Sequence, residues 1–306
     1  MSAIAKAVPE AEVPTTHKDR TSKRGRPRLT TILGVSLVLG WFAIAGLAPL
    51  LSPYNPLGQD APPLTAPSMQ HLFGTDGVGR DVLSRVLYGA RVSLPAAFIV
   101  MVVALAIGVI VGAVSGYLSG VADLILMRIV ELVLVFPPII LAMVVAAVLG
   151  PSLRNAIIAL IVVSWPAFAR VTRASVLSLR EREFVQSSRL LGVSPARTLA
   201  RDIMPNVVGP VIVLATLQLG QAILLLASLS FLGLGVVPPT AEWGSMVASG
   251  AFDFSHWWVA TFAGIAILTS VLGFNLVGDS LRDRLDPSAT TSVARVGRTS
   301  HQEGKA

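Results

Sequence analysis

The segment VSLPAAFIVMVVALAIGVIVGAVSGYLSGVA at residues 92–122 contains no Asp, Glu, Lys or Arg. A helix that crosses a bilayer needs about 20 mostly apolar residues, so this segment is long enough to span a membrane. Within it, glycine recurs at every fourth position: Gly108, Gly112, Gly116 and Gly120. This spacing aligns small residues along one helix face, which allows a neighbouring backbone to approach closely. We interpret the face as a surface for helix packing, with a packing face beside a moving gate as the alternative.

Five other runs also lack Asp, Glu, Lys and Arg: 32–51, 132–153, 155–169, 203–241 and 254–278. The run 155–169 is short, and it can span if Arg154 and Arg170 extend to opposite interfaces. The run 203–241 is too long for one helix, so we expect its Gly and Pro residues to end the helix near Phe231. The sequence therefore predicts an all-α integral membrane protein with six transmembrane helices.

A few residues inside these runs are unusual for a plain apolar helix. Pro137 and Pro138 predict a kink in the third span, because proline lacks the N–H that a helix needs. Gln218 and Gln221 in the fifth span and Asn275 in the sixth are polar. Such residues either line a polar path or hold helices together by hydrogen bonds. For each residue alone we slightly favour holding helices together, and we keep the three as candidate pore-lining residues.

The composition supports a membrane protein and excludes several other classes. Charged residues make up 13% of the chain, about half the roughly 25% that is usual in soluble domains. Apolar residues make up 53%, which argues against a disordered or collagen-like chain. The chain has no cysteine, so it carries no disulfide scaffold, no thiolate nucleophile and no Cys-ligated metal site.

Lysine and arginine are distributed unevenly along the six-span topology. Twenty of the 24 Lys and Arg residues fall on one side: before the first span, between the second and third, between the fourth and fifth, and after the sixth. Cytoplasmic loops carry the excess of positive charge, so we expect both termini in the cytoplasm. Membrane orientation also accounts for the net charge of +7 without a nucleic-acid partner.

Sequence motifs for catalysis or cofactor binding are missing. No Gly-x-x-x-x-Gly-Lys-Ser/Thr loop occurs, and all four lysines lie in the tails. The four histidines lack metal-ligand spacing. We therefore expect no enzyme activity, cofactor or metal site in this chain. No run carries Asp, Glu or Lys at its centre, which argues against an ion-coupled secondary transporter, the main alternative. A membrane anchor without transport activity is a second alternative.

Charged and aromatic residues near the ends of the runs have simple structural interpretations. Arg80, Asp81, Arg85 and Arg91 recur along the segment that enters the second span. We expect them to pair with one another, with a partner surface as the alternative. Arg128 and Glu131 have the spacing of an ion pair on one helix face. Three tryptophans suit the aromatic belt at the membrane interface: Trp243, Trp257 and Trp258.

The segment between the fourth and fifth spans, residues 170–205, is expected to form a helical hairpin. A helix ends at a turn around Gly192, and Ser194 and Pro195 belong to the same turn. Before the turn, Phe184, Ser187 and Leu191 recur with helical spacing and share one face. Ser188 lies beside this face, and Arg182 and Arg189 flank it. Small side chains there allow a partner surface to approach closely.

The stretch QSSRLLGVSPARTLARDIMPN at 186–206 resembles the cytoplasmic "EAA" loop of ABC-importer permeases. It departs from that pattern, since Gln186 and Ser187 replace a Glu-Ala pair, Ser188 replaces a second Ala, and Met204 replaces a Leu. Three other stretches strengthen the resemblance: FGTDGVGRDVLSRVLYGARVSL at 73–94, FLGLGVVPPTAEWG at 231–244 and NLVGDSLRDRLDP at 275–287. Together they resemble the C-type permease subunit of the dipeptide, oligopeptide and nickel ABC importers.

The resemblance implies a type I permease fold and a function. The chain would form half of a translocation pore in the bacterial inner membrane together with a homologous second permease. Two cytoplasmic ATPase subunits would bind ATP and Mg²⁺, and an external solute-binding protein would deliver the cargo, which is a peptide or nickel. The residues that would contact the ATPase lie in the loop: Phe184, Gln186, Ser187, Ser188, Arg189, Leu191, Gly192 and Pro205.

The resemblance and the topology together predict how the chain is divided. The predicted parts are a cytoplasmic basic tail at 1–30, a first transmembrane helix at 31–52, an external loop with an amphipathic helix at 53–92, a five-helix permease core at 93–280 that includes the coupling loop 170–205, and a cytoplasmic tail at 281–306.

Overall fold

The computed structural model describes residues 29–285, so the predictions for the N-terminal tail before residue 29 and for residues 286–306 lie outside the described residues. The helices are α1 (Leu29–Leu51), α2 (Val82–Leu118), α3 (Gly120–Val135), α4 (Pro138–Leu149), α5 (Leu153–Arg180), α6 (Glu183–Leu190), α7 (Pro195–Thr198), α8 (Met204–Phe231), α9 (Trp243–Gly250) and α10 (Trp258–Leu285). A π-helical turn, Leu199–Ile203, precedes α8, and a 3₁₀ turn, Phe254–His256, precedes α10. Within residues 29–285 there is no β-strand, which confirms the all-α prediction.

Five helices are long and apolar enough to cross a membrane by themselves: α1, α2, α5, the segment Pro195–Phe231 that contains α8, and α10. The predicted third span is instead two helices, α3 and α4, which meet at an angle of 91°. Counted as one broken span, this pair gives the six spans expected. Phe136 and Pro137 adopt extended conformations at the break, because the residue before a proline avoids the helical region and Pro137 lacks a donor N–H.

The second span begins earlier than the sequence predicted. We expected an external loop with an amphipathic helix at 53–92 and a permease core that begins at residue 93, and α2 is a single helix of 37 residues that crosses this boundary. The carboxylate of Asp81 caps its first turn by accepting a hydrogen bond from the N–H of Ser84 at 2.7 Å. The boundary at residue 92 therefore falls inside a continuous helix.

The glycine face of α2 packs directly against α5. A Cβ atom added at Gly108 would lie 2.4 Å from the Cβ of Phe168, and one at Gly112 would lie 2.3 Å from the carbonyl oxygen of Ala169. One at Gly116 would lie 3.0 Å from the carbonyl oxygen of Arg173. The packing prediction is confirmed for these three glycines. Gly120 differs, because nothing lies within 4 Å of an added Cβ atom and because it is the first residue of α3, with φ +64°.

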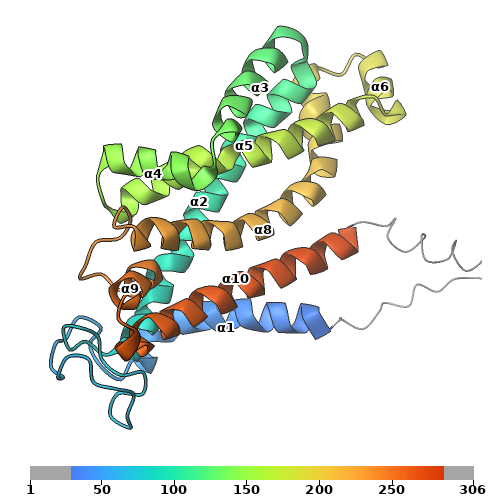
Figure 1. The fold of residues 1–306 in the computed structure, drawn as a ribbon. Helices are drawn as coiled ribbons and strands as arrows, with labels where there is room; N and C mark the ends of the chain where they lie inside the picture. The colour runs from blue at the N-terminus through green and yellow to red at the C-terminus, as the bar shows by residue number, and fades with distance from the viewer. Residues whose placement is uncertain (1–28, 286–306) are drawn as a thin grey trace, which may run out of the picture.

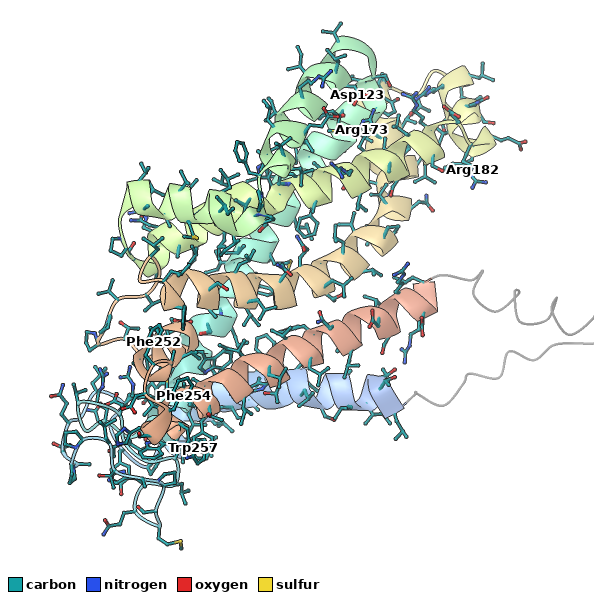
Figure 2. All side chains as sticks on the ribbon, in the orientation of Figure 1. Asp123, Arg173, Arg182, Phe252, Phe254 and Trp257 are labelled. Atoms are coloured by element: carbon teal, nitrogen blue, oxygen red, sulfur yellow. The ribbon has the colours of Figure 1, made fainter. Side chains whose placement is uncertain are left out.

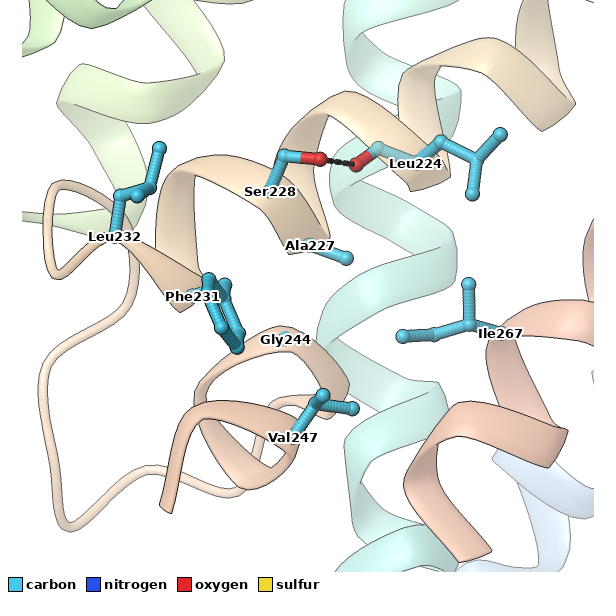
Figure 3. A pocket seen from close by; sticks show the side chains of 8 residues that line it. All are labelled: Leu224, Ala227, Ser228, Phe231, Leu232, Gly244, Val247 and Ile267. Atoms are coloured by element: carbon cyan, nitrogen blue, oxygen red, sulfur yellow. Dashed lines mark hydrogen bonds between the residues drawn. The ribbon is translucent and has the colours of Figure 1, made fainter. Parts of the chain in front are cut away.

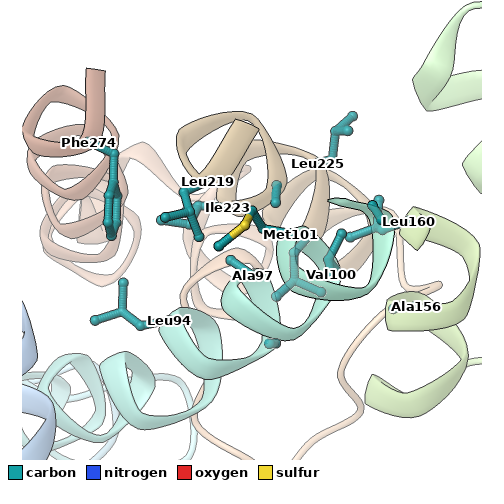
Figure 4. Packing of buried hydrophobic residues seen from close by; sticks show 14 of the residues in the cluster. Leu94, Ala97, Val100, Met101, Ala156, Leu160, Leu219, Ile223, Leu225 and Phe274 are labelled. Atoms are coloured by element: carbon teal, nitrogen blue, oxygen red, sulfur yellow. The ribbon is translucent and has the colours of Figure 1, made fainter. Parts of the chain in front are cut away.

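The hydrophobic core lies where α2, α5, α8 and α10 meet (Figure 4). Val100 and Leu160 bring α2 and α5 together, and Ile223 fills the space on the α8 side; all three are almost completely buried. Many other large apolar side chains are exposed. An apolar exterior around a packed interior is the arrangement that a lipid environment favours.

The first and last described helices lie side by side. The hydroxyl of Thr31 in α1 donates to the hydroxyl of Ser280 in α10 at 2.9 Å, and the indole of Trp41 donates to Thr269 at 3.0 Å. In Figure 1, the start of α1, the end of α10 and α6 all lie on the right, while α9 and the 52–81 loop lie on the left. We call these two sides the α6 end and the α9 end.

Candidate coupling helix and pore residues

The loop between α5 and α8 forms the predicted helical hairpin. α6 begins after Arg182, and its two turns carry Glu183 at the start and Arg189 at the end. This order of charges complements the helix dipole. The inward side of α6 is held by Val185, which is fully buried. The turn after α6 uses Gly192 at φ +76°, a conformation that favours glycine.

The outward side of α6 carries the candidate coupling residues. Phe184 is 47% exposed and Leu191 is 83% exposed, and Ser187 between them is exposed as well. Gln186 is exposed and bonds only locally, through its amide to the carbonyl oxygen of Glu181 at 3.1 Å. Ser188 is half-buried, and the carbonyl oxygen of Ser188 accepts from the N–H of Val193. Two turns of helix thus present apolar side chains outward, which is typical of a docking surface.

Pro205 completes the set of candidate coupling residues at the other end of the loop. It occupies the first turn of α8, where its missing N–H costs no helical hydrogen bond. Its side chain is exposed. The coupling role of α6 and Pro205 remains a prediction, and the geometry leaves their outward surfaces accessible.

Of the candidate pore residues, Gln218 and Gln221 lie on α8 and Asn275 lies on α10. Gln221 is exposed, and Gln218 and Asn275 are half-buried. The α8 and α10 backbones come close here, because a Cβ atom at Gly220 would lie 3.1 Å from the Oδ1 of Asn275. None of the three polar side chains forms a hydrogen bond to another residue within 29–285. They therefore do not join helices of this chain, and pore lining stays a prediction.

Near the α9 end, α8, α9 and α10 enclose a pocket of about 280 Å³ (Figure 3). Its walls are mainly apolar and include Phe231, Val247 and Ile267. The one hydroxyl in its lining, from Ser228, donates to the carbonyl oxygen of Leu224 at 2.7 Å. The candidate pore residues are not among its lining residues. The lining of this pocket therefore contains no charged side chain to bind a charged ligand.

The charged side chains around the start of α2 make contacts within the chain, but not with one another as expected. The guanidinium of Arg80 binds the carboxylate of Asp76 at 2.7 Å, and the guanidinium of Arg85 approaches the same carboxylate at 3.5 Å. Arg85 also donates to the carbonyl oxygen of Pro239 at 3.2 Å. Asp81 accepts from His71 at 2.9 Å. These pairs tie the 52–81 loop to the start of α2 and to the loop after α8.

Glu242 and Trp243 show how the loop after α8 is fixed. The Glu242 side chain is fully buried and accepts from the N–H groups of Gly244 and Ser245, each at 2.9 Å. Burial raises the pKa of Glu242, and these N–H donors oppose that rise. The expectation that Trp243 lies in an interfacial belt is wrong, because its side chain is fully buried, and Trp258 is only 6% exposed. Trp257 is 52% exposed (Figure 2).

Two contacts at the α6 end were missed by sequence reasoning. Asp123 and Arg173 form a two-point ion pair, with N–O distances of 2.5 and 2.6 Å (Figure 2). The guanidinium of Arg189 lies over the ring of Tyr117 at 5.1 Å. The signal available in the sequence was position alone, since Asp123 directly follows one apolar run and Arg173 follows another. The expected pair of Arg128 and Glu131 is confirmed at 3.2 Å.

Comparison with known proteins agrees with this architecture. The family model described as "binding-protein-dependent transport system inner membrane component" matches residues 104–291. The dipeptide transport system permease protein DppC of Escherichia coli K12 is 46% identical over 273 residues, covering 87% of this chain and 90% of that protein. The protein of the same name from Alkalihalophilus pseudofirmus is 44% identical over 262 residues, covering 84% and 85%. The di/tripeptide permease DppC of Pseudomonas aeruginosa is 43% identical over 249 residues, covering 78% and 82%.

The membrane-spanning bundle and the length of these matches define a multi-pass inner-membrane transport protein. More specifically, the chain belongs to the family of binding-protein-dependent transport system inner membrane components, and it is a permease subunit.

Proposed function

We propose that this chain is one half of the translocation pore of an ATP-driven ABC importer for short peptides. The observation that carries the proposal is the similarity to the dipeptide permease of Escherichia coli, which extends over 90% of that protein's length. Dipeptides, rather than nickel or long peptides, are the favoured cargo because all three relatives described above are named for dipeptides or for di- and tripeptides.

The partners follow from the same proposal. A second permease completes the pore, two ATPase subunits bind at the α6 end, and a binding protein delivers peptide at the α9 end. The exposed apolar side chains of α6 suit a groove on the ATPase. This arrangement requires the α6 end and both termini to face the cytoplasm, as the distribution of Lys and Arg predicts. ATP hydrolysis in the two ATPase subunits supplies the energy for transport.

The test is reconstitution in liposomes. The complete complex should transport a radiolabelled dipeptide only when ATP is present on the side of the membrane where the ATPase subunits lie. The loaded binding protein should stimulate ATP hydrolysis. The purified chain alone should neither bind nor hydrolyse ATP. A parallel assay with Ni²⁺ separates the two cargo classes. Uptake that is driven by a proton or sodium gradient without ATPase subunits would contradict the proposal and favour a secondary transporter.

A further inference from the structure

The turn between α2 and α3 is held by an arginine at the end of α5. Arg180, the last residue of α5, donates to the hydroxyl of Ser119 and to the carbonyl oxygen of Gly116, the latter at 3.2 Å. Ser119 has φ 57°, an uncommon conformation for a residue with a side chain. The Arg180 contacts therefore hold the turn in one defined shape.

The start of α3 is fixed to α5 as well. Asp123 binds Arg173 through two N–O contacts and also accepts from the hydroxyl of Ser115 in α2. Two-point arginine–carboxylate pairs have defined geometry, so they fix orientation as well as distance. One carboxylate thus joins α2, α3 and α5 within a turn of the α2–α3 connection.

α6 itself has little that fixes its orientation. It has only eight residues, which is too short for a helix that is stable without packing. Val185 anchors its inward side, while most of its other side chains are exposed. Arg189 supplies the additional link, because its guanidinium carbon lies 5.1 Å from the centre of the Tyr117 ring near the end of α2. A guanidinium over an aromatic face at this distance is attracted to it.

We propose that Tyr117 is a positioning residue for energy coupling: through Arg189, it transmits displacement of α6 to α2 and to the α2–α3 turn. This inference rests on the function proposed above. Arg180 and Asp123 keep the turn attached to α5, so α2, α3 and α5 receive the displacement together. Tyr117 contacts neither substrate nor nucleotide in this scheme and acts only through α6.

The test uses the complete complex in liposomes and measures dipeptides transported per ATP hydrolysed. Tyr117→Leu removes the ring, and Arg189→Gln removes the charge from an exposed side chain whose loss does not disturb the core. We expect each to lower the transport ratio by about two- to fivefold, the effect of a contact of this kind. In the Tyr117→Leu complex the ATPase subunits should co-purify in wild-type amounts, because Tyr117 is not one of the residues assigned to the ATPase contact. Tyr117→Phe keeps the ring and should restore the wild-type ratio.

Tyr88 is a matched control on the same helix. Its ring lies 5.7 Å from the guanidinium of Arg91 at the opposite end of α2. Tyr88→Leu should leave the transport ratio unchanged. The double variant of Tyr117→Leu and Arg189→Gln should be no worse than either single variant, because both remove one contact.

Three results would overturn the inference: a wild-type ratio in Arg189→Gln, losses that add in the double variant, or an equal loss in Tyr88→Leu. Its failure differs from failure of the proposed function. If only the inference about Tyr117 fails, the wild-type complex still couples ATP hydrolysis to dipeptide uptake. If the proposed function fails, the wild-type complex does not couple them.

Discussion

The indole N–H of Trp243 donates a hydrogen bond to the main-chain carbonyl oxygen of Val86 at 2.9 Å. The two residues are 157 positions apart, at the first residue of α9 and in the second turn of α2. The Trp243 ring also packs edge-on against Trp41 of α1, with ring centres 5.0 Å apart. One buried side chain therefore joins α1, α2 and α9 at the α9 end.

Trp243 should contribute strongly to stability. Trp243→Phe removes the hydrogen bond and should cost about 1 kcal/mol, while Trp243→Ala also leaves a cavity and should cost about 3–5 kcal/mol. Thermal unfolding in detergent, followed by circular dichroism, should give the lowest melting temperature for Trp243→Ala, a higher one for Trp243→Phe and the highest for the wild type. The half-exposed Trp257 provides the control, and Trp257→Phe should melt like the wild type. Equal melting of Trp243→Phe and Trp257→Phe would contradict the role assigned to the hydrogen bond.

Gly112 should tolerate no side chain. A Cβ atom there meets the backbone oxygen of Ala169 at 2.3 Å, so Gly112→Ala must push α2 and α5 apart. We expect a loss of about 1–3 kcal/mol in the free energy of unfolding. Gly40 of α1 has nothing within 4 Å of its added Cβ, so Gly40→Ala is the matched control and should not destabilise the protein. Chemical denaturation in mixed micelles measures both, and equal stability of the two variants would refute the packing argument.

The turn after α6 should be essential for coupling. Gly192→Pro removes the N–H that donates to the carbonyl oxygen of Arg189 at 3.0 Å, and it forces φ to a negative value. Ser188→Trp overfills a half-buried position. Both variants should remain in the membrane but lose stimulation of ATP hydrolysis by the loaded binding protein. Ala196→Ser, an exposed change in the same loop, should keep it. Normal uptake by both disruptive variants would mean that α6 does not dock on the ATPase.

The orientation can be tested by chemical labelling, because the chain has no native cysteine. Met69 in the 52–81 loop is 94% exposed and Ser187 on α6 is exposed. A membrane-impermeant maleimide should label Met69→Cys in intact spheroplasts and Ser187→Cys only after the membrane is opened. Labelling of Ser187→Cys in intact spheroplasts would contradict the predicted topology and place α6 outside the cytoplasm.

Glu242 should make stability depend on pH. Burial raises its pKa in the folded protein, so the folded state holds the proton more tightly than the unfolded chain. The stability contributed by this proton is complete below the unfolded value of about 4.3 and is lost as the pH rises through the higher folded value. The melting temperature of the wild type should therefore fall across this interval. Glu242→Gln cannot titrate and should show a flatter profile, whatever its absolute stability, and parallel profiles would contradict the assignment.

Local patterns predicted the helices well because membrane spans depend on length and hydrophobicity. The glycine period predicted the α2 face that packs on α5, since spacing of four residues fixes a helix face. Gly120 broke the pattern because α2 had already ended at Leu118. The pair Pro137–Pro138 predicted a kink but not the angle of 91°, which is set by what α3 and α4 pack against.

Long-range contacts were beyond sequence reasoning. Asp123 and Arg173 are 50 positions apart, and their positions after two apolar runs do not indicate that these two residues pair with each other. Trp243 and Trp257 are both tryptophans near the ends of apolar runs, yet Trp243 is buried and Trp257 is half-exposed. Burial of a single aromatic residue at the start of a short helix depends on how helices from distant parts of the chain pack around it. The outward face of α6 was predictable, because its spacing is helical and local.

The unbroken length of α2 has a mechanical consequence. At 37 residues it is about 55 Å long, so one rod reaches from the loop before α2 to the turn beside α6. Along the glycine face, the α2 backbone lies against backbone and Cβ atoms of α5, so sliding of the two helices would require backbone movement. We therefore expect the pair to tilt as a unit. In such a lever, a tilt of a few degrees at one end produces a displacement of several ångströms at the other, without any helix changing its internal hydrogen bonds.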